Sequence, residues 1–153
     1  MFRRFFTFSV CNPKFDVALL LLRIGIGTNL FLRHGVEKIH GFSIPAHFSN
    51  DIGIGETPTF LIAFFGDAIC SLLLVLGIGT RWIAMYYFCL ISVAWGVRHH
   101  FMYWDTPGHH LSGDHGELIV CYLLFMVLLF LTGPGRYSVD AWIAGSKKGS
   151  NSD

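Results

Sequence analysis

Charged residues are scarce in this chain of 153 residues. Lys, Arg, Asp and Glu together make up 14% of it, whereas 53% is hydrophobic. An ordinary soluble domain is about 25% charged. The composition therefore excludes a typical soluble protein and indicates a membrane protein. The formal net charge is only +1, and there is no basic stripe of the kind that binds nucleic acid. We expect no nucleic-acid partner.

Paired cysteines are also lacking. The four cysteines include no C-x-x-C pair, and Cys70, Cys89 and Cys121 each lie within an apolar run. Thiol–disulfide exchange needs two thiols within reach of each other, so this chemistry is disfavoured. There is also no haem-attachment motif, flavin fingerprint or nucleotide-binding loop. Any electron transfer would therefore need a bound cofactor or a partner protein.

What the sequence does contain is four long apolar runs. A membrane-spanning helix needs about 20 residues to cross ~30 Å of hydrocarbon. The last two runs are somewhat short by this measure, but flanking residues 98–104 and 114–116 can extend them. We expect an all-α, polytopic membrane protein, a four-transmembrane-helix bundle with two long external loops at 33–58 and 98–116. The four runs are Phe15–Leu32, Thr59–Ile78, Trp82–Val97 and Glu117–Thr132.

Basic residues beside these runs predict the orientation. One side would carry Arg3, Arg4, Lys14, Arg81, Arg136, Lys147 and Lys148, and the other only Arg33, Lys38 and Arg98. Basic residues favour the cytoplasmic side. We therefore expect both termini in the cytoplasm of a cell whose membrane, most simply the bacterial inner membrane, holds the chain. The first run is read as an uncleaved span, because Arg23 interrupts it and no small-x-small cleavage site follows.

The C-terminal region follows a different pattern. Gly133-Pro134-Gly135 should end the fourth span, and Ser138 can cap a short interfacial helix with Asp140 in its first turn. The predicted organisation is a cytoplasmic N-terminal tail at 1–14, a membrane domain at 15–143 and a disordered cytoplasmic tail at 144–153. Apolar side chains would anchor the short helix at the inner surface: Tyr137, Val139, Trp142 and Ile143.

All eight histidines fall in the two expected external links. The first link holds His34, His40 and His47, and the second holds His99, His100, His109, His110 and His115. Histidine both ligates metals and titrates near neutral pH, so this clustering suggests a site at the outer face. The links also contain many aromatic residues, which leaves open that they are simply interfacial re-entrant segments.

Two charges interrupt the spans themselves. Arg23 lies about a third of the way into the first span, and Asp67 lies near the middle of the second. A lone charge in hydrocarbon costs roughly 2.5–3.5 kcal/mol, so each should face the interior and have a partner. We expect the two to pair with each other. The pair would either fix helix packing or couple to proton or electron transfer.

Helical spacing extends this interior face outward. Arg23, Gly27, Leu30, His34 and Lys38 recur at three- and four-residue steps. His99 and His100 end a similar stripe on the third span, and Glu117 opens the fourth. We expect a site just inside the outer surface. If it exchanges protons, the catalytic residues would be His34, Glu117, Arg23 and Asp67, and the cofactor-binding residues Gly27, Lys38, His99 and His100. If it binds a divalent metal, the ligands would come from His34, Glu37, His99, His100 and His115.

At this point the sequence resembles a known family. The segments LRIGIG (22–27), HGVEKIHGF (34–42), LGIGTR (76–81) and TGPGRYSVD (132–140), together with Asp67 and Glu117, resemble DoxX-family membrane proteins over residues 15–143. The resemblance implies a four-helix membrane bundle in a wider group that includes quinone-reactive and redox-accessory proteins. Some relatives are similar to subunits of thiosulfate:quinone oxidoreductases, and others are linked to oxidative-stress complexes. This chain departs from the family in having Asp67 where Glu is usual, and in its histidine-rich links.

Three functions follow from these observations. The chain can be an integral membrane subunit of a quinone-linked redox system, which would make it part of an oxidoreductase with a quinone as its cofactor. It can be a metal-binding membrane protein that uses the external histidines. It can also be a non-catalytic subunit that docks a protein partner or forms a homo-oligomer in the lipid bilayer. We favour the first and keep the other two as alternatives.

Overall fold

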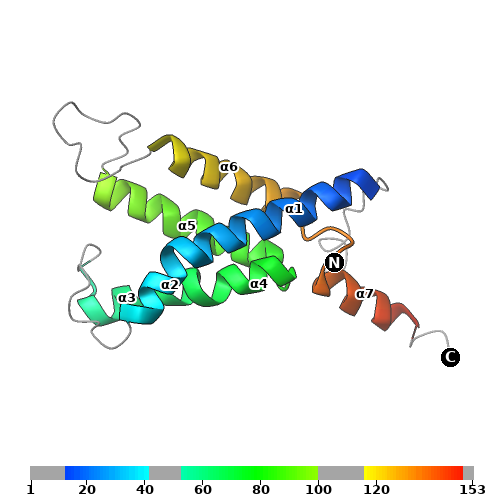
Figure 1. Cartoon of the computed structure of the whole chain (residues 1–153), viewed down its shortest axis with the longest axis horizontal. Helices are drawn as coiled ribbons and strands as arrows, with labels where there is room; N and C mark the ends of the chain where they lie inside the picture. Colours follow the sequence, from blue (N-terminus) through cyan, green and yellow to red (C-terminus); the bar gives the residue numbers. More distant parts are fainter. Residues whose placement is uncertain (1–12, 42–52, 100–115, 150–153) are drawn as a thin grey trace.

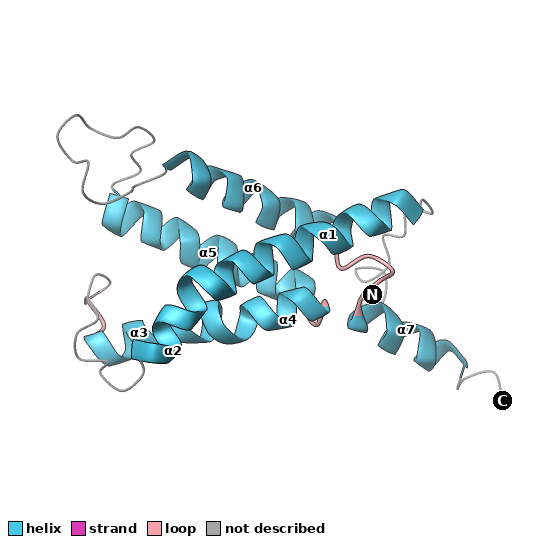
Figure 2. Cartoon of the chain, in the orientation of Figure 1, coloured by secondary structure: helices cyan, strands magenta, loops and turns pink. Residues whose placement is uncertain are grey.

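The computed structural model describes residues 13–41, 53–99 and 116–149, and this part of the chain consists of helices and short connections without any strand (Figure 2). The all-α prediction is therefore confirmed. Each predicted apolar run lies in helix, apart from Gly77 and Ile78 at the end of the second run, which form a turn. The elements are α1 (Pro13–Leu30), η2 (Phe31–Gly35), α2 (Val36–His40), α3 (Glu56–Phe64), η5 (Phe65–Cys70), α4 (Ser71–Leu76), α5 (Thr80–His99), α6 (Gly116–Thr132) and α7 (Val139–Gly149).

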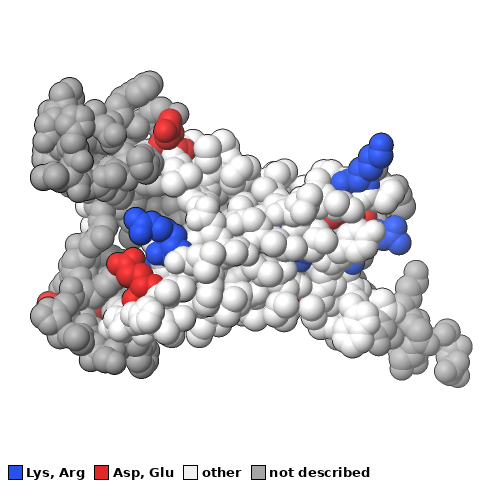
Figure 3. Space-filling view, in the orientation of Figure 1, with Lys and Arg blue, Asp and Glu red and all other residues white. Residues whose placement is uncertain are grey.

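Two continuous helical stretches are long and apolar enough to cross a membrane. They are Pro13–His40, of 28 residues, and Glu56–Leu76, of 21 residues, while Gly116–Thr132 is a shorter apolar helix. The space-filling view shows charged side chains gathered at two opposite ends, with a middle band free of them on this face (Figure 3). Large apolar side chains such as Leu21 and Leu124 are more than 60% exposed. This surface suits lipid rather than water.

Each of the first two long stretches has an identifiable end. The first begins at Pro13, whose missing N–H costs nothing at a helix start, and Asp16 lies in its first turn. The second ends at Gly77 (φ 73°) in a Schellman arrangement, in which the N–H of Ile78 donates to Leu73 O (3.0 Å) and that of Gly77 to Leu74 O (3.1 Å). The chain can therefore turn at once into α5.

The C-terminal elements end largely where the sequence predicts. Gly133 (φ 81°) ends α6, and its N–H donates to Leu129 O. Ser138 caps α7, because its hydroxyl accepts the N–H of Ala141 at 3.1 Å. That predicted cap is confirmed. However, α7 continues to Gly149, so the first residues of the tail predicted to be disordered, 144–153, are helical.

The helices pack as two antiparallel pairs. α1 contacts mainly α4, and α5 contacts mainly α6. Figure 1 shows α1 crossing α4, with α6 beside α5. A Cβ on Gly27 would lie 2.6 Å from Val75 Cγ2 and 2.8 Å from Ser71 O, so α1 and α4 touch closely here. The buried core contains Leu19, Ile26, Leu30, Cys70, Leu74, Ile83, Ala84, Tyr87, Met126 and Leu129.

The two histidine-containing links leave from the same end of the molecule. α2 ends, α3 begins, α5 ends and α6 begins at the left of Figure 1, whereas the α4–α5 turn and the start of α7 lie toward the right. Both links leave from one end because successive long helices run in opposite directions. The links themselves, at 42–52 and 100–115, lie outside the described residues.

Candidate functional site

A buried ion pair joins α2 to η5. Lys38 Nζ lies 2.6 Å from Asp67 Oδ2, and the two side chains are only 12% and 13% exposed. The predicted pairing of Asp67 with Arg23 is therefore wrong. The antiparallel register explains why: Gly35 lies beside Asp67, and Arg23 lies beside Gly77. Residues 23 and 35 are about 18 Å apart along the helix, which exceeds the reach of a guanidinium.

Both helices have a π-helical turn where they cross. The turns are η2 at Phe31–Gly35 and η5 at Phe65–Cys70. A Cβ on Gly35 would lie 2.5 Å from Asp67 O, so backbone meets backbone at this point. π-turns are rare and frequently occur at functional sites. Here they position the Lys38–Asp67 pair.

The π-turn also changes which residues of the first helix face inward. Arg23 and Leu30 are buried, as the predicted stripe requires, but Gly35 rather than His34 takes the next buried position. Within the wider turn the inward position falls one residue later than in a regular helix. His34 is therefore exposed, and the prediction that it points into the bundle is wrong. It still interacts electrostatically with Asp67, Lys38 and Glu37.

Two tyrosines of α5 bond to backbone carbonyls around η5. The hydroxyl of Tyr87 donates to Gly66 O at 2.7 Å, and that of Tyr86 donates to Ile62 O at 2.7 Å. Ser71 Oγ donates to Asp67 O at 2.6 Å. The carbonyls of Ile62 and Gly66 also accept the backbone N–H groups of Phe65 and Ser71, so the tyrosine bonds add a second donor and join α5 to the second long helix. The Asp67 carboxylate also interacts electrostatically with Cys70, Tyr86 and Tyr87.

Arg23 lies at the opposite end of the bundle and is fully buried. Its guanidinium donates to the carbonyl of Tyr137 and fills the space where a side chain on Gly77 would go. It also interacts electrostatically with Asp140. The carboxylate of Asp140 in turn accepts the N–H of Gly79 (3.0 Å) and of Thr80 (3.3 Å), which caps the start of α5. Arg23 thus holds the start of α7 against the α4–α5 turn.

A second contact fastens the same segment to α1. Asp16, only 4% exposed, accepts the backbone N–H of Arg136 at 3.0 Å. Gly135 (φ 73°) lies against Leu19. Sequence reasoning missed Asp16, although an acid in the first turn of an otherwise apolar helix is a visible signal. It also missed Tyr86 and Tyr87, which resemble ordinary core aromatics.

A model of the DoxX family matches residues 18–100, more than half of the chain. The chain belongs to the DoxX family. It is also 27% identical over 132 residues, 83% of each chain, to a protein of Haemophilus influenzae described as an uncharacterized protein. No solved structure matches. Lys38, Asp67 and both tyrosines of α5 lie within the DoxX match, whereas α6 and α7 lie beyond it.

Other predicted site residues of this DoxX-family chain have different surroundings. Gly27 contacts α4, so it is a helix-packing position with no open space for a cofactor. Glu117 is exposed in the first turn of α6, which lies apart from α2 at that end of the molecule (Figure 1). Among the described residues, no hydrogen bond or ion pair joins Glu117 to another residue. The predicted partnership of His34 with Glu117 thus has no support in the described part.

The side chains of the other three histidines predicted for the site are not among those described. His99 ends α5 but its side chain is not described, and His100 and His115 lie outside the described residues. Within 13–41, 53–99 and 116–149 there is no group of three or more side chains suited to hold a metal. The convergence of His99, His100 and His115 on one site stays a prediction.

Proposed function

We propose that this DoxX-family chain is a four-span integral membrane subunit of a quinone-linked redox system, with both termini in the cytoplasm. The observation that carries the proposal is the buried Lys38–Asp67 pair. Ionisable groups within membrane-spanning segments are costly and usually mark proton or substrate pathways. Of the third and fourth spans, α5 has 20 residues and α6 has 17, enough to cross with their flanking residues.

The donor set at this end suits a quinone head group. A bound quinone supplies a centre that takes up two electrons and two protons. Lys38 offers ammonium N–H groups to a carbonyl oxygen, and Asp67 can hold or release a proton. His34 is exposed beside them and interacts electrostatically with both. An imidazole can both accept and donate a proton, so His34 can pass protons between the pair and the surrounding water.

The bonded backbone around η5 keeps the pair in place. Tyr87 is fully buried and bonded to Gly66, the residue before Asp67. Gly35 leaves no gap between the two helices beside the pair. The carboxylate and the ammonium are therefore held at a fixed distance, which is the preorganisation that proton transfer needs.

The test is quinone binding by protein purified in mild detergent. Solvent extraction of the purified protein should release a quinone, and a short-chain quinone analogue should bind in a fluorescence-quenching titration. Lys38→Met and Asp67→Asn should each weaken binding by about ten-fold, the loss expected for a charge-assisted hydrogen bond of about 1.5 kcal/mol. Glu56→Gln, a change of an exposed acid in the same stretch of helix, is the matched control.

Two results would contradict the proposal. One is wild-type protein that neither retains a quinone nor binds the analogue. The other is equal binding by Asp67→Asn and wild type, since the pair would then have no part in it.

A docking subunit is the second candidate. α7 favours it, because Trp142 is 74% and Tyr137 53% exposed at the end opposite the Lys38–Asp67 pair. Aromatic residues are enriched at protein interfaces and also at membrane surfaces. In-cell photo-crosslinking from position 142 separates the two: crosslinks to one protein favour docking, and crosslinks to lipid alone favour simple anchoring.

A further inference from the structure

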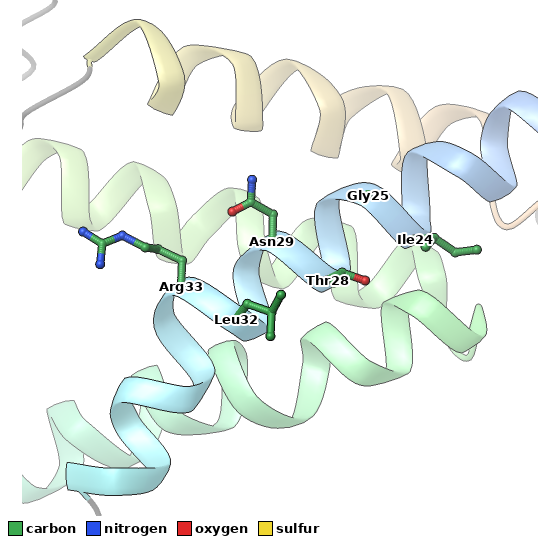
Figure 4. A pocket seen from close by; sticks show the side chains of 6 residues that line it. All are labelled: Ile24, Gly25, Thr28, Asn29, Leu32 and Arg33. Atoms are coloured by element: carbon green, nitrogen blue, oxygen red, sulfur yellow. The ribbon is translucent and has the colours of Figure 1, made fainter.

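Two adjoining hollows lie along the exposed side of α1. The larger, of about 630 Å³, is lined by Ile24, Gly25, Thr28, Asn29, Leu32 and Arg33 (Figure 4). The smaller, of about 260 Å³, lies between α1 and α6 and is lined by Leu21, Leu22, Gly25, Ile26, Asn29, Leu118, Cys121, Tyr122 and Phe125. Gly25 and Asn29 line both, so the hollows form one branched groove.

The packing of the helices explains why the groove is there. α1 packs mainly on α4 and α6 mainly on α5, so α1 and α6 are not pressed together. Gly25 has no side chain, and a Cβ built on it would meet nothing within 4 Å. The groove is therefore open to the lipid around the bundle.

The lining changes from charged to apolar along the helix. Arg33 is exposed at one end, Asn29 and Thr28 are exposed in the middle, and Ile24 and Leu21 follow. In Figure 4 the side chains of Arg33 and Asn29 both extend away from the helix. Arg33 and Leu21 are about 18 Å apart along the axis. Arg binds phosphate well, and the amide of Asn29 can donate to an ester carbonyl.

We propose that this branched groove binds one anionic phospholipid with two acyl chains, with the phosphate at Arg33. The glycerol esters lie at Thr28 and Asn29. One acyl chain follows Gly25 and Ile24, and the other enters between α1 and α6 toward Phe125. The lipid belongs to the leaflet at the α2 end of the bundle. This proposal does not rest on the quinone function, and it holds for either orientation in the membrane.

The lining of the groove favours a lipid over an apolar helix of a second copy, because such a helix would leave Arg33 and Asn29 without polar partners. A neutral prenylated ligand has one chain and no phosphate, so it would leave one branch and Arg33 unused. A polar Asn29 in hydrocarbon also needs a partner, which an ester supplies.

The test is native mass spectrometry of the full chain released from detergent. It is incubated with phosphatidylglycerol, with phosphatidylethanolamine of the same acyl chains, or with lyso-phosphatidylglycerol. Wild type should retain one phosphatidylglycerol about five-fold better than phosphatidylethanolamine, the ratio that corresponds to about 1 kcal/mol for one basic residue. It should retain the single-chain lipid less well than the two-chain lipid.

Two variants with matched controls locate the site. Arg33→Gln should abolish the preference for the anionic lipid, whereas Arg136→Gln, a change of an exposed arginine at the other end, should keep it. Gly25→Leu should reduce retention of both two-chain lipids, whereas Gly145→Leu should not, although both glycines have open space around them. The proposal is overturned if Arg33→Gln keeps the preference for the anionic lipid. It is also overturned if wild type retains all three lipids equally, or if a neutral prenylquinone alone saturates the groove.

Discussion

Gly35 lies directly against the carbonyl oxygen of Asp67, which a Cβ at position 35 would approach to 2.5 Å. This contact sets the distance between the first two long helices at the level of the Lys38–Asp67 ion pair. A backbone cannot move aside as the end of a side chain can. The contact therefore makes position 35 one of the most constrained in the chain.

Gly35→Ala should push η2 away from η5 and destabilise the protein by about 1–3 kcal/mol, the usual cost of overpacking. Thermal unfolding in detergent measures the loss. Gly41→Ala is the control, because a Cβ there meets nothing within 4 Å. A Gly35→Ala protein as stable as the control would show that the crossing tolerates a wider spacing.

Lys38 and Asp67 should be coupled in a double-mutant cycle. Lys38→Met or Asp67→Asn alone leaves a nearly buried charge without its partner. Breaking a buried ion pair in this way destabilises a protein by about 3–5 kcal/mol. The double variant should lose less than the sum of the two. The cycle of Arg23→Leu with Asp67→Asn should instead be additive, because those residues do not meet. Additive losses for Lys38 with Asp67 would argue against the pair.

Tyr87→Phe should destabilise the protein more than Tyr86→Phe does. Both changes remove one hydroxyl and one hydrogen bond to a carbonyl of the second long helix. The Tyr87 bond is buried, so its loss removes a hydrogen bond from the core at a cost of about 0.5–1.5 kcal/mol, although Gly66 O keeps the N–H of Ser71 as a donor. The Tyr86 bond is exposed at the surface of the bundle, where its loss should cost less. Unfolding temperatures of the two variants, compared side by side, decide the matter, and the reverse order would contradict the assignment.

Asp140→Ala should destabilise the start of α5 by about 0.5–2 kcal/mol, as the loss of a cap does. The carboxylate accepts the N–H groups of Gly79 and Thr80. Limited proteolysis should then cut at the α4–α5 turn sooner than in wild type. Asp140→Asn, which retains one acceptor oxygen, should be affected less. Equal rates of cleavage in all three proteins would mean that the cap has no effect on this turn.

A C-terminal reporter fusion tests the orientation. The excess of basic residues beside the expected cytoplasmic ends predicts that a reporter active only inside the cell will be active there. A reporter that works only outside would invert the topology and place the Lys38–Asp67 pair near the inner face. The lipid proposal would survive that result with the leaflet exchanged.

Hydropathy predicts the helices well but not how they pair. Every apolar run is helical, and the cap at Ser138 follows from local spacing. The pairing of Arg23 with Asp67 fails because hydropathy carries no information on the register of two packed helices. Close contacts at Gly27 and Gly35 set that register, and a sequence does not show which glycines touch a neighbour.

The candidate site was predicted only in part. Lys38 and Asp67 are both among the predicted site residues, but Asp67 is predicted to pair with Arg23, and no ion-pair partner is predicted for Lys38. The count of 3.6 residues per turn places His34 inside, but that count fails within the π-turn at Phe31–Gly35, to which His34 belongs. Tyr86 and Tyr87 became recognisable only through their bonds to the carbonyls around η5.

The bonds around Arg23 also have a consequence for biogenesis. Arg23 belongs to α1, which leaves the ribosome long before the carbonyl that it bonds, at Tyr137. Until then the first helix carries a charge without its final acceptor, which weakens its commitment to the lipid phase. Completion of synthesis, rather than insertion of any single helix, would then lock the bundle, and nascent chains stalled before residue 137 should remain accessible to membrane quality-control proteases.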